Sequence, residues 1–325
     1  MTLRATATIE RWPIAGEFTI ARGSKTTADV VVATVVDGDA QGRGECVPYG
    51  RYGESVEQVA DEIGSARIPD GRDDLVRALP AGAARNAIDC ALWDLNARRQ
   101  GKRVWELLDI PPPARVVTAF TLSLASPAGM AQEAERHAHL PLLKAKLGDT
   151  DGRDAERLRA VRRAAPDCRL IVDVNEGWDA EMLASVAPVA ADLGVELIEQ
   201  PLPAGADAIL ATYDSPVPLG ADESVRDGTE LTSLVGRYQV VNIKLDKTGG
   251  LTRAIEVVQE ARRLGFEIML GCMVATSLAM APALMLARHA RFVDLDGPLL
   301  LAKDRPGGLH YNDGVVSMPG TGLWG

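Results

Sequence analysis

The stretch between residues 142 and 200 decides the fold. It contains three short apolar segments separated by helical segments, and they read LLKAKL (142–147), LIVDVN (170–175) and VELIEQ (195–200). Runs this rich in branched apolar residues are typical of strands that are buried on both faces. Strands that alternate with helices in this way predict parallel βα units.

The same unit recurs at roughly 25-residue intervals along most of the chain. Amphipathic helical segments lie between the strands, for example at 154–165 and 251–264. Eight strands are predicted, at 116–124, 142–147, 170–175, 195–200, 219–223, 240–245, 267–273 and 292–296. We therefore predict an α/β fold with a TIM-type (β/α)7β barrel, and a doubly wound open sheet is the alternative.

The N-terminal third of the chain has a different pattern. Strand-like segments at 4–12 and 30–36 precede a mainly helical region from residue 55 to residue 100, and Pro111-Pro112-Pro113 then makes a stiff break. This order predicts a mixed α+β domain at 1–113, a catalytic barrel at 114–300 and a C-terminal segment at 301–325.

Composition narrows the class of partner. The chain has 325 residues, of which 46% are hydrophobic, so it can build a full-sized core. A formal net charge of −10 provides no basic surface for phosphate backbones, so we expect a small-molecule partner and no nucleic acid. A homo-oligomer is left open.

Neither export nor membrane insertion is expected. Four scattered cysteines, Cys46, Cys90, Cys168 and Cys272, match neither a zinc site nor a disulfide framework, and residues 1–13 lack the apolar core of a signal peptide. The long apolar run at 268–287 is divided by Gly271 and Thr276-Ser277, which favours a buried strand and a helix over a membrane span. We expect a cytoplasmic protein.

A barrel places its chemistry at the carboxyl ends of the strands, and polar residues gather there. Side chains two apart on a strand share a face, so several pairs can point together into the barrel mouth. The polar residues are Lys144, Lys146, Asp173, Asn175, Glu199, Asp222, Glu223, Lys244, Asp294 and Asp296.

Three carboxylates on consecutive strands, Asp173, Glu199 and Asp222, predict an all-oxygen metal site. Such a site suits a hard cation such as Mg²⁺. The alternative is that each acid pairs separately with a lysine or an arginine.

Lys146 and Lys244 lie two strands before and two strands after Glu199, which places two bases on opposite flanks of the metal. A neighbouring cation can leave such a lysine partly neutral. The alternative is that Lys146 and Lys244 are ordinary solvated surface lysines.

The ordered set KAK (144–146), DVN (173–175), EQP (199–201), DES (222–224) and NIKL (242–245) resembles the enolase superfamily, in its muconate-lactonizing subgroup. The resemblance implies a lysine or histidine base that acts with Mg²⁺ through an ene-diolate. The resemblance covers the whole chain. It implies that 1–113 is an α+β capping domain and that 301–325 returns to it.

Within that superfamily the chain is most similar to dipeptide epimerases, above all those acting on L-Ala-D/L-Glu in murein-peptide metabolism. The similar stretches are IARGS (20–24), PYGRYGES (48–55) and DLDGP (294–298). The resemblance implies that Asp294 and Asp296 bind the ammonium group of a dipeptide and that Arg22 meets its glutamate side chain. It also places Lys144, Asn175, Cys272 and Met273 in the substrate site.

The implied reaction inverts the α-carbon next to the terminal carboxylate by 1,1-proton transfer between two lysines, through an ene-diolate stabilised by Mg²⁺. Alternatives are an o-succinylbenzoate synthase, a muconate cycloisomerase, or a barrel that binds peptides without catalysis. Paired acids at 294 and 296 disfavour the first two, whose substrates have no ammonium group.

Overall fold

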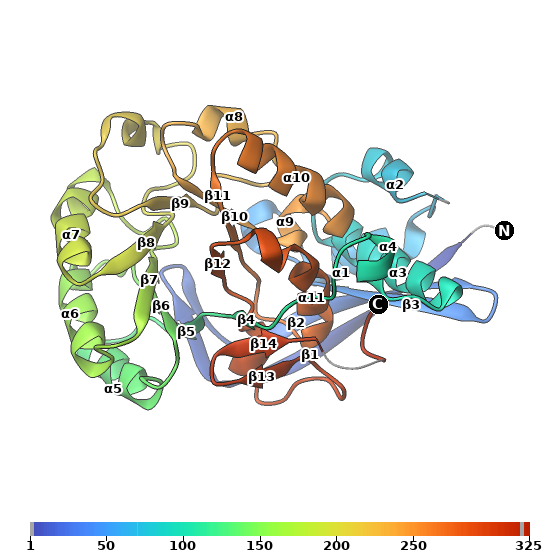
Figure 1. Ribbon diagram of the computed structural model, residues 1–325, viewed down its shortest axis with the longest axis horizontal. Coiled ribbons are helices and arrows are strands. Elements are labelled where there is room, and N and C mark those ends of the chain that lie inside the picture. Colours follow the sequence, from blue (N-terminus) through green and yellow to red (C-terminus); the bar gives the residue numbers. More distant parts are fainter. Residues whose placement is uncertain (1–2, 70, 319–321) are drawn as a thin grey trace.

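The computed structural model describes residues 3–69, 71–318 and 322–325. An open antiparallel sheet with helices on one face forms one side of the molecule, and a curled parallel sheet ringed by helices forms the other (Figure 1). The predicted α/β barrel with an N-terminal α+β region is confirmed.

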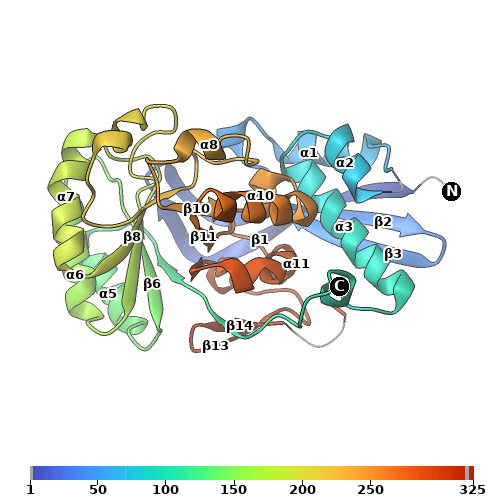
Figure 2. The same cartoon turned by 45° about the horizontal axis from the view of Figure 1, so that its top comes forward.

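The N-terminal sheet has the order β1-β2-β3. β1 (Arg4–Ile20) and β2 (Gly23–Asp37) form a long hairpin whose last pair is Ile20 with Gly23, so Ala21 and Arg22 make its tip. β3 (Ala40–Cys46) lies directly beneath helix α3 (Ala83–Gln100). Glycine is required there, because a Cβ atom on Gly42 would lie 2.1 Å from the carbonyl oxygen of Ala91. Figure 2 shows the helices of this region lying across the sheet.

The remaining helices of the N-terminal region are short. They are η1 (Gly50–Tyr52), α1 (Val56–Ser65), α2 (Arg72–Ala78) and α4 (Val104–Leu107).

Eight parallel strands form the barrel sheet, in sequence order from β5 to β12. The first and last strands are joined by a hydrogen bond from Ala119 N to Val293 O (2.8 Å) rather than by a full ladder. The strands are β5 (Phe120–Leu122), β6 (Leu142–Lys146), β7 (Arg169–Asp173), β8 (Val195–Glu199), β9 (Leu219–Ala221), β10 (Val240–Ile243), β11 (Glu267–Leu270) and β12 (Phe292–Val293).

The connections are less regular than the repeat predicted. The connection after β8 holds only the 3₁₀ helix η2, and the one after β9 holds only the four-residue helix α8. The helices are α5 (Pro127–Arg136), α6 (Asp154–Ala164), α7 (Ala180–Asp192), η2 (Ala208–Thr212), α8 (Leu231–Leu234), α9 (Leu245–Thr248), α10 (Leu251–Arg263), α11 (Ser277–Ala283), η3 (Leu284–His289) and η4 (Gly297–Leu300).

The strand predicted at 116–124 is two strands. Its first part, β4 (Val116–Val117), pairs with β14 (Val315–Ser317), which pairs in turn with β13 (His310–Asn312). Only its second part belongs to the barrel. The C-terminal segment also reaches the N-terminal region, where Trp324 Nε1 donates to Cys90 O (2.9 Å).

The apolar run at 268–287 is divided between β11, α11 and η3, as predicted. Among the described residues, no helix has both the length and the apolar character needed to cross a membrane.

Candidate active site

The alternation of side chains along the barrel strands builds the site. A buried apolar cluster fills the inside of the barrel. Its members lie on six of the barrel strands or, for Ala119, immediately before β5: Ala119, Leu142, Ile171, Leu197, Val240, Met269 and Phe292. Side chains two or four residues further along share that inward face. On β6 they are Lys144 and Lys146, and on β7 the residue is Asp173, so a polar layer lies directly above the apolar one.

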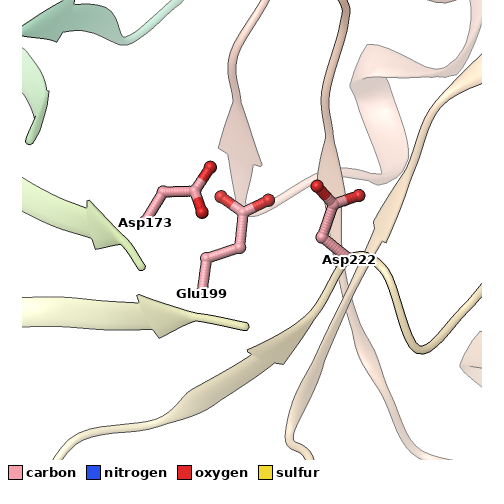
Figure 3. A group of neighbouring side chains, drawn as sticks. All are labelled: Asp173, Glu199 and Asp222. Atoms are coloured by element: carbon pink, nitrogen blue, oxygen red, sulfur yellow. The ribbon is translucent and has the colours of Figure 1, made fainter. Parts of the chain in front are cut away.

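The three predicted carboxylates do come together. Asp173 ends β7, Glu199 ends β8 and Asp222 follows β9, and one ligand oxygen from each lies within 4.8 Å of the others. All three are buried, and Figure 3 shows their carboxylates in a row, turned toward one another. Three anions this close require cations around them.

Lysines supply that charge. Lys146 Nζ lies 2.6 Å from Asp173 Oδ2 and Lys244 Nζ lies 2.6 Å from Asp222 Oδ2, so the two lysines stand at opposite ends of the trio with Glu199 between. Both lysines are 7% exposed, which excludes ordinary solvated side chains. Lys144 is more deeply buried and lies 3.0 Å from Asp173 and 2.7 Å from Glu199. From the sequence, a cluster of the three acids and separate acid–lysine pairs were alternatives. The structure shows both, because the clustered acids also form ion pairs with lysines.

The titration of these groups follows from their neighbours. Burial, and then the charge of Asp173, raise the pKa of Glu199 to about 7. Burial alone would raise the pKa of Asp222, but the ammonium groups of Lys244 and Lys247 hold it below its usual range. Burial disfavours the charged form of Lys244, yet Asp222 and Glu199 outweigh burial and raise its pKa. The expected neutral lysine thus requires a cation that neutralises the carboxylates.

Two more acids, Asp294 and Asp296, follow the last barrel strand, β12. Asp296 Oδ2 accepts a hydrogen bond from Thr121 N (2.7 Å), and Lys144 Nζ donates to Asp294 Oδ2 (2.7 Å). Burial, and then Asp294, raise the pKa of Asp296 to about 7. Within the described part of the chain the buried Asp294 Oδ1 has no hydrogen-bond partner, so it is free to accept one from a bound molecule.

The tip of the β1–β2 hairpin reaches the barrel. Arg22 donates to Glu223 Oε1 (2.6 Å), to the carbonyl oxygen of Asn175 (2.8 Å) and to the hydroxyl of Tyr49 (2.8 Å). Asn175 follows β7 in a left-handed conformation, with φ 49°, which turns its carbonyl toward the hairpin tip. The predicted Arg22 and Asn175 are therefore neighbours, although 153 residues separate them.

These groups share one cavity of about 730 Å³ between the N-terminal region and the barrel. Asp222 is the only member of the trio on its wall, because Asp173 and Glu199 lie beneath. The predicted residues on the wall are Arg22, Lys144, Lys146, Asn175, Asp222, Lys244, Cys272, Met273, Asp294 and Asp296. The cavity is thus anionic at the 294–296 end and has a guanidinium at the other.

Two buried residues that contact Asp222 were not predicted from the sequence. Lys247, which is not among the predicted site residues, is 1% exposed and donates to Asp222 Oδ1 (2.6 Å). The three-residue spacing between Lys244 and Lys247 could have predicted this contact. Residues three apart in a helical turn lie on the same side, so a turn after β10 places both lysines near the same strand ends. Gln200 accepts from Asp222 N (2.9 Å) and from Ser224 N (3.0 Å), and a polar residue following a buried strand gave no hint of this.

The chain belongs to the enolase superfamily, in the family of mandelate racemase and muconate lactonizing enzyme. Residues 3–109 match the model of that family's N-terminal domain, and residues 129–323 match the enolase C-terminal domain-like model.

Two curated relatives cover nearly the whole chain. The L-Ala-D/L-Glu epimerase of Escherichia coli K12 is 48% identical over 95% of this chain and 98% of its own. The N-acetyl-D-glutamate racemase of a Pseudoalteromonas species is 46% identical over 91% of this chain and 95% of its own.

Two solved structures are similar to this chain over nearly its whole length. An Agrobacterium tumefaciens enolase family member, with homology to dipeptide epimerases and with sodium and L-Ala-L-Glu bound, is 51% identical, covers 99% of this chain and 100% of its own, and has a TM-score of 0.94. A dipeptide epimerase of Enterococcus faecalis in complex with Mg and L-Leu-L-Tyr is 27% identical, with a TM-score of 0.90 over 99% of its own chain and the whole of this one.

Proposed function

We propose that this protein is a magnesium-dependent dipeptide epimerase acting on L-Ala-D/L-Glu. The observation that carries the proposal is the placement of Lys146 and Lys244 at opposite ends of the carboxylate trio, at distances of 2.6 Å from Asp173 and from Asp222. Two bases on either side of one carbon can remove a proton from one face and return it to the other.

The trio fits a hard divalent cation. Its donors are all carboxylate oxygens, they lie within 4.8 Å of one another, and the buried Glu199 Oε2 accepts no hydrogen bond from the described residues although Lys144 Nζ is 2.7 Å away. Asp173, Glu199 and Asp222 would hold Mg²⁺. The ion would stabilise negative charge that develops on the substrate carboxylate when the adjacent proton leaves.

The lysines would carry out the proton transfer. One of them, neutral, takes the α-proton, and the other, as an ammonium, donates a proton to the opposite face of the carbanion. Lys144, which is 1% exposed and contacts Asp173, Glu199 and Asp294, adds a fixed positive charge beneath the reacting carboxylate.

The two ends of the cavity would orient a zwitterionic dipeptide. Asp294 and Asp296 would bind its ammonium group, and the unpartnered Asp294 Oδ1 supports that role. Arg22, at the far end, would receive the glutamate side chain through its planar guanidinium. Asn175, Cys272 and Met273, on the cavity wall, would contact the peptide between these ends.

The paired acids also separate this proposal from a synthase or cycloisomerase of the same superfamily, whose substrates have no cation for them to bind.

We further propose a cytoplasmic role in murein-peptide metabolism, which the four free thiols support. Any homo-oligomer can be detected by light scattering.

Proton NMR of L-Ala-L-Glu in D₂O tests the function. The protein should produce L-Ala-D-Glu with deuterium at the α-carbon of glutamate. Binding of the dipeptide with neither deuterium uptake nor epimerisation would favour a binding protein without catalysis, and turnover confined to N-acetylglutamate would favour the racemase activity of the second relative.

A further inference from the structure

We propose that Lys247 is a positioning residue that fixes Asp222 for metal binding; the inference rests on the proposed function. Lys247 Nζ donates to Asp222 Oδ1 (2.6 Å), to Asp222 O (2.6 Å) and to Asn242 O (2.9 Å). An ammonium group has three protons, and these three bonds use all of them. Lys247 is 1% exposed and is absent from the cavity wall, so it acts on Asp222 and not on a substrate.

Asp222 needs such support more than the other two carboxylates do. Asp173 and Glu199 are the last residues of five-residue strands, and they pair with each other in the ladder. Asp222 lies beyond the end of β9, a strand of only three residues whose registered pairs with β10 stop at Ala221. Its N–H group donates to the side chain of Gln200, and its carbonyl oxygen accepts from Lys247 Nζ (2.6 Å) and, at a longer distance, from Val225 N (3.2 Å).

The same contact orients the carboxylate. Lys247 holds Oδ1, so only Oδ2 is presented to Lys244, at 2.6 Å. Without Lys247, Oδ1 of this buried carboxylate would lose its hydrogen bond, and the carboxylate could turn away from the orientation in which Oδ2 faces Lys244. Groups that orient metal ligands in this way commonly contribute about 10- to 100-fold to metal affinity or activity.

A matched control distinguishes positioning of Asp222 from support of helix α9, to which Lys247 belongs. Arg85 is also a buried cation bound to this helix, since it donates to Thr248 O (2.6 Å) and to Gly249 O (3.1 Å). None of its hydrogen bonds reaches Asp222. Arg85→Met therefore removes a comparable buried charge next to α9 and leaves the carboxylate contact in place.

The test is direct binding of Mn²⁺, which prefers the same oxygen ligands, measured by electron paramagnetic resonance of the free ion without substrate. Wild type, Lys247→Met, Lys247→Gln and Arg85→Met are compared after circular dichroism has verified folding. Lys247→Met and Lys247→Gln should raise the Kd for Mn²⁺ by about 10- to 100-fold, and Arg85→Met by less than about 3-fold. If Lys247→Met does not fold, Lys247→Gln, which keeps two N–H donors, carries the comparison.

Unchanged affinity in the folded Lys247 variants would overturn the inference and leave the proposed function standing. An equal loss in Arg85→Met would also overturn it, because the effect would then belong to α9. Failure of both Lys247 variants to fold would assign the residue to the core and end the proposal. Absence of Mn²⁺ binding in the wild type would overturn the metal site itself, and with it both proposals.

Discussion

Arg22 Nη2 donates a 2.6 Å hydrogen bond to Glu223 Oε1, although 201 residues separate the two in sequence. This pair joins the hairpin tip of the N-terminal sheet to the end of the fifth barrel strand. The guanidinium proposed to receive the substrate's side-chain carboxylate is thus already bound to a carboxylate of the protein. A glutamate side chain must compete with Glu223 for Arg22.

Replacement of Arg22 should harm acidic dipeptides selectively. For Arg22→Met we expect kcat/KM on L-Ala-L-Glu to fall by roughly 30-fold or more, about 2 kcal/mol, because the substrate carboxylate would be buried without its partner. L-Ala-L-Leu and L-Ala-L-Met should lose much less. Arg51→Met is the matched control, because Arg51 binds Glu176 on the same rim but not Glu223. Equal losses on all three dipeptides would reassign Arg22 to loop structure.

Removal of the competing charge should have the opposite effect. Glu223→Gln should raise the preference for L-Ala-L-Glu over L-Ala-L-Met by about 2- to 10-fold, since a hydrogen bond worth about 0.5 to 1.4 kcal/mol to Arg22 is weakened. The ratio of the two kcat/KM values is the measurement, because it cancels any general effect on turnover. A ratio that stays constant or falls would show that Glu223 does not compete with the substrate.

Binding of the dipeptide should weaken in acid. The pKa of Asp296 is raised to about 7 by burial and by Asp294, so this group is a neutral acid below that pH and a carboxylate above it. Since the substrate's ammonium group requires the carboxylate, KM should rise as the pH falls through about 7. Asp296→Asn should have a high KM with little pH dependence over the same range. A variant whose KM profile matches that of the wild type would contradict the assignment.

Metal removal should abolish turnover. Chelation should stop epimerisation and added Mg²⁺ should restore it, and Asp222→Asn should lose more than the roughly 100-fold that outer partners of a metal typically contribute. Asp207→Asn is a useful control, because Asp207 is also buried but binds Ser224 and Tyr238 instead of the trio. Full turnover by rigorously metal-free protein would refute the metal site.

The barrel and its polar layer could be predicted because both follow from local periodicity. Alternation along each strand placed Lys144 and Lys146 on one face, and the parallel order of the strands brought Asp173, Glu199 and Asp222 to one end. The short connection after β8 departs from the predicted repeat because Pro201, Pro203, Pro216 and Pro218 leave room for only one short helix between them.

Contacts that depend on the whole fold could not be read from the chain. The pairing of Arg22 with Glu223 depends on how the hairpin lies over the barrel, and the burial of Lys247 depends on a single turn of helix at α9. The split of the segment 116–124 arose because Val116 and Val117 find partners near the C-terminus. The domain boundaries at 113 and 300 stay predictions.

Lys146 and Lys244 should serve opposite faces of one carbon, and isomer-specific exchange of the α-proton distinguishes this from one-base chemistry. Lys146→Ala and Lys244→Ala are each incubated in D₂O with L-Ala-L-Glu and, separately, with L-Ala-D-Glu, and loss of the α-proton of glutamate is followed by NMR. Neither variant should epimerise, and any exchange that remains should be confined to one isomer, a different one for each variant. Equal exchange of both isomers by either variant, or continued epimerisation, would contradict the two-base account.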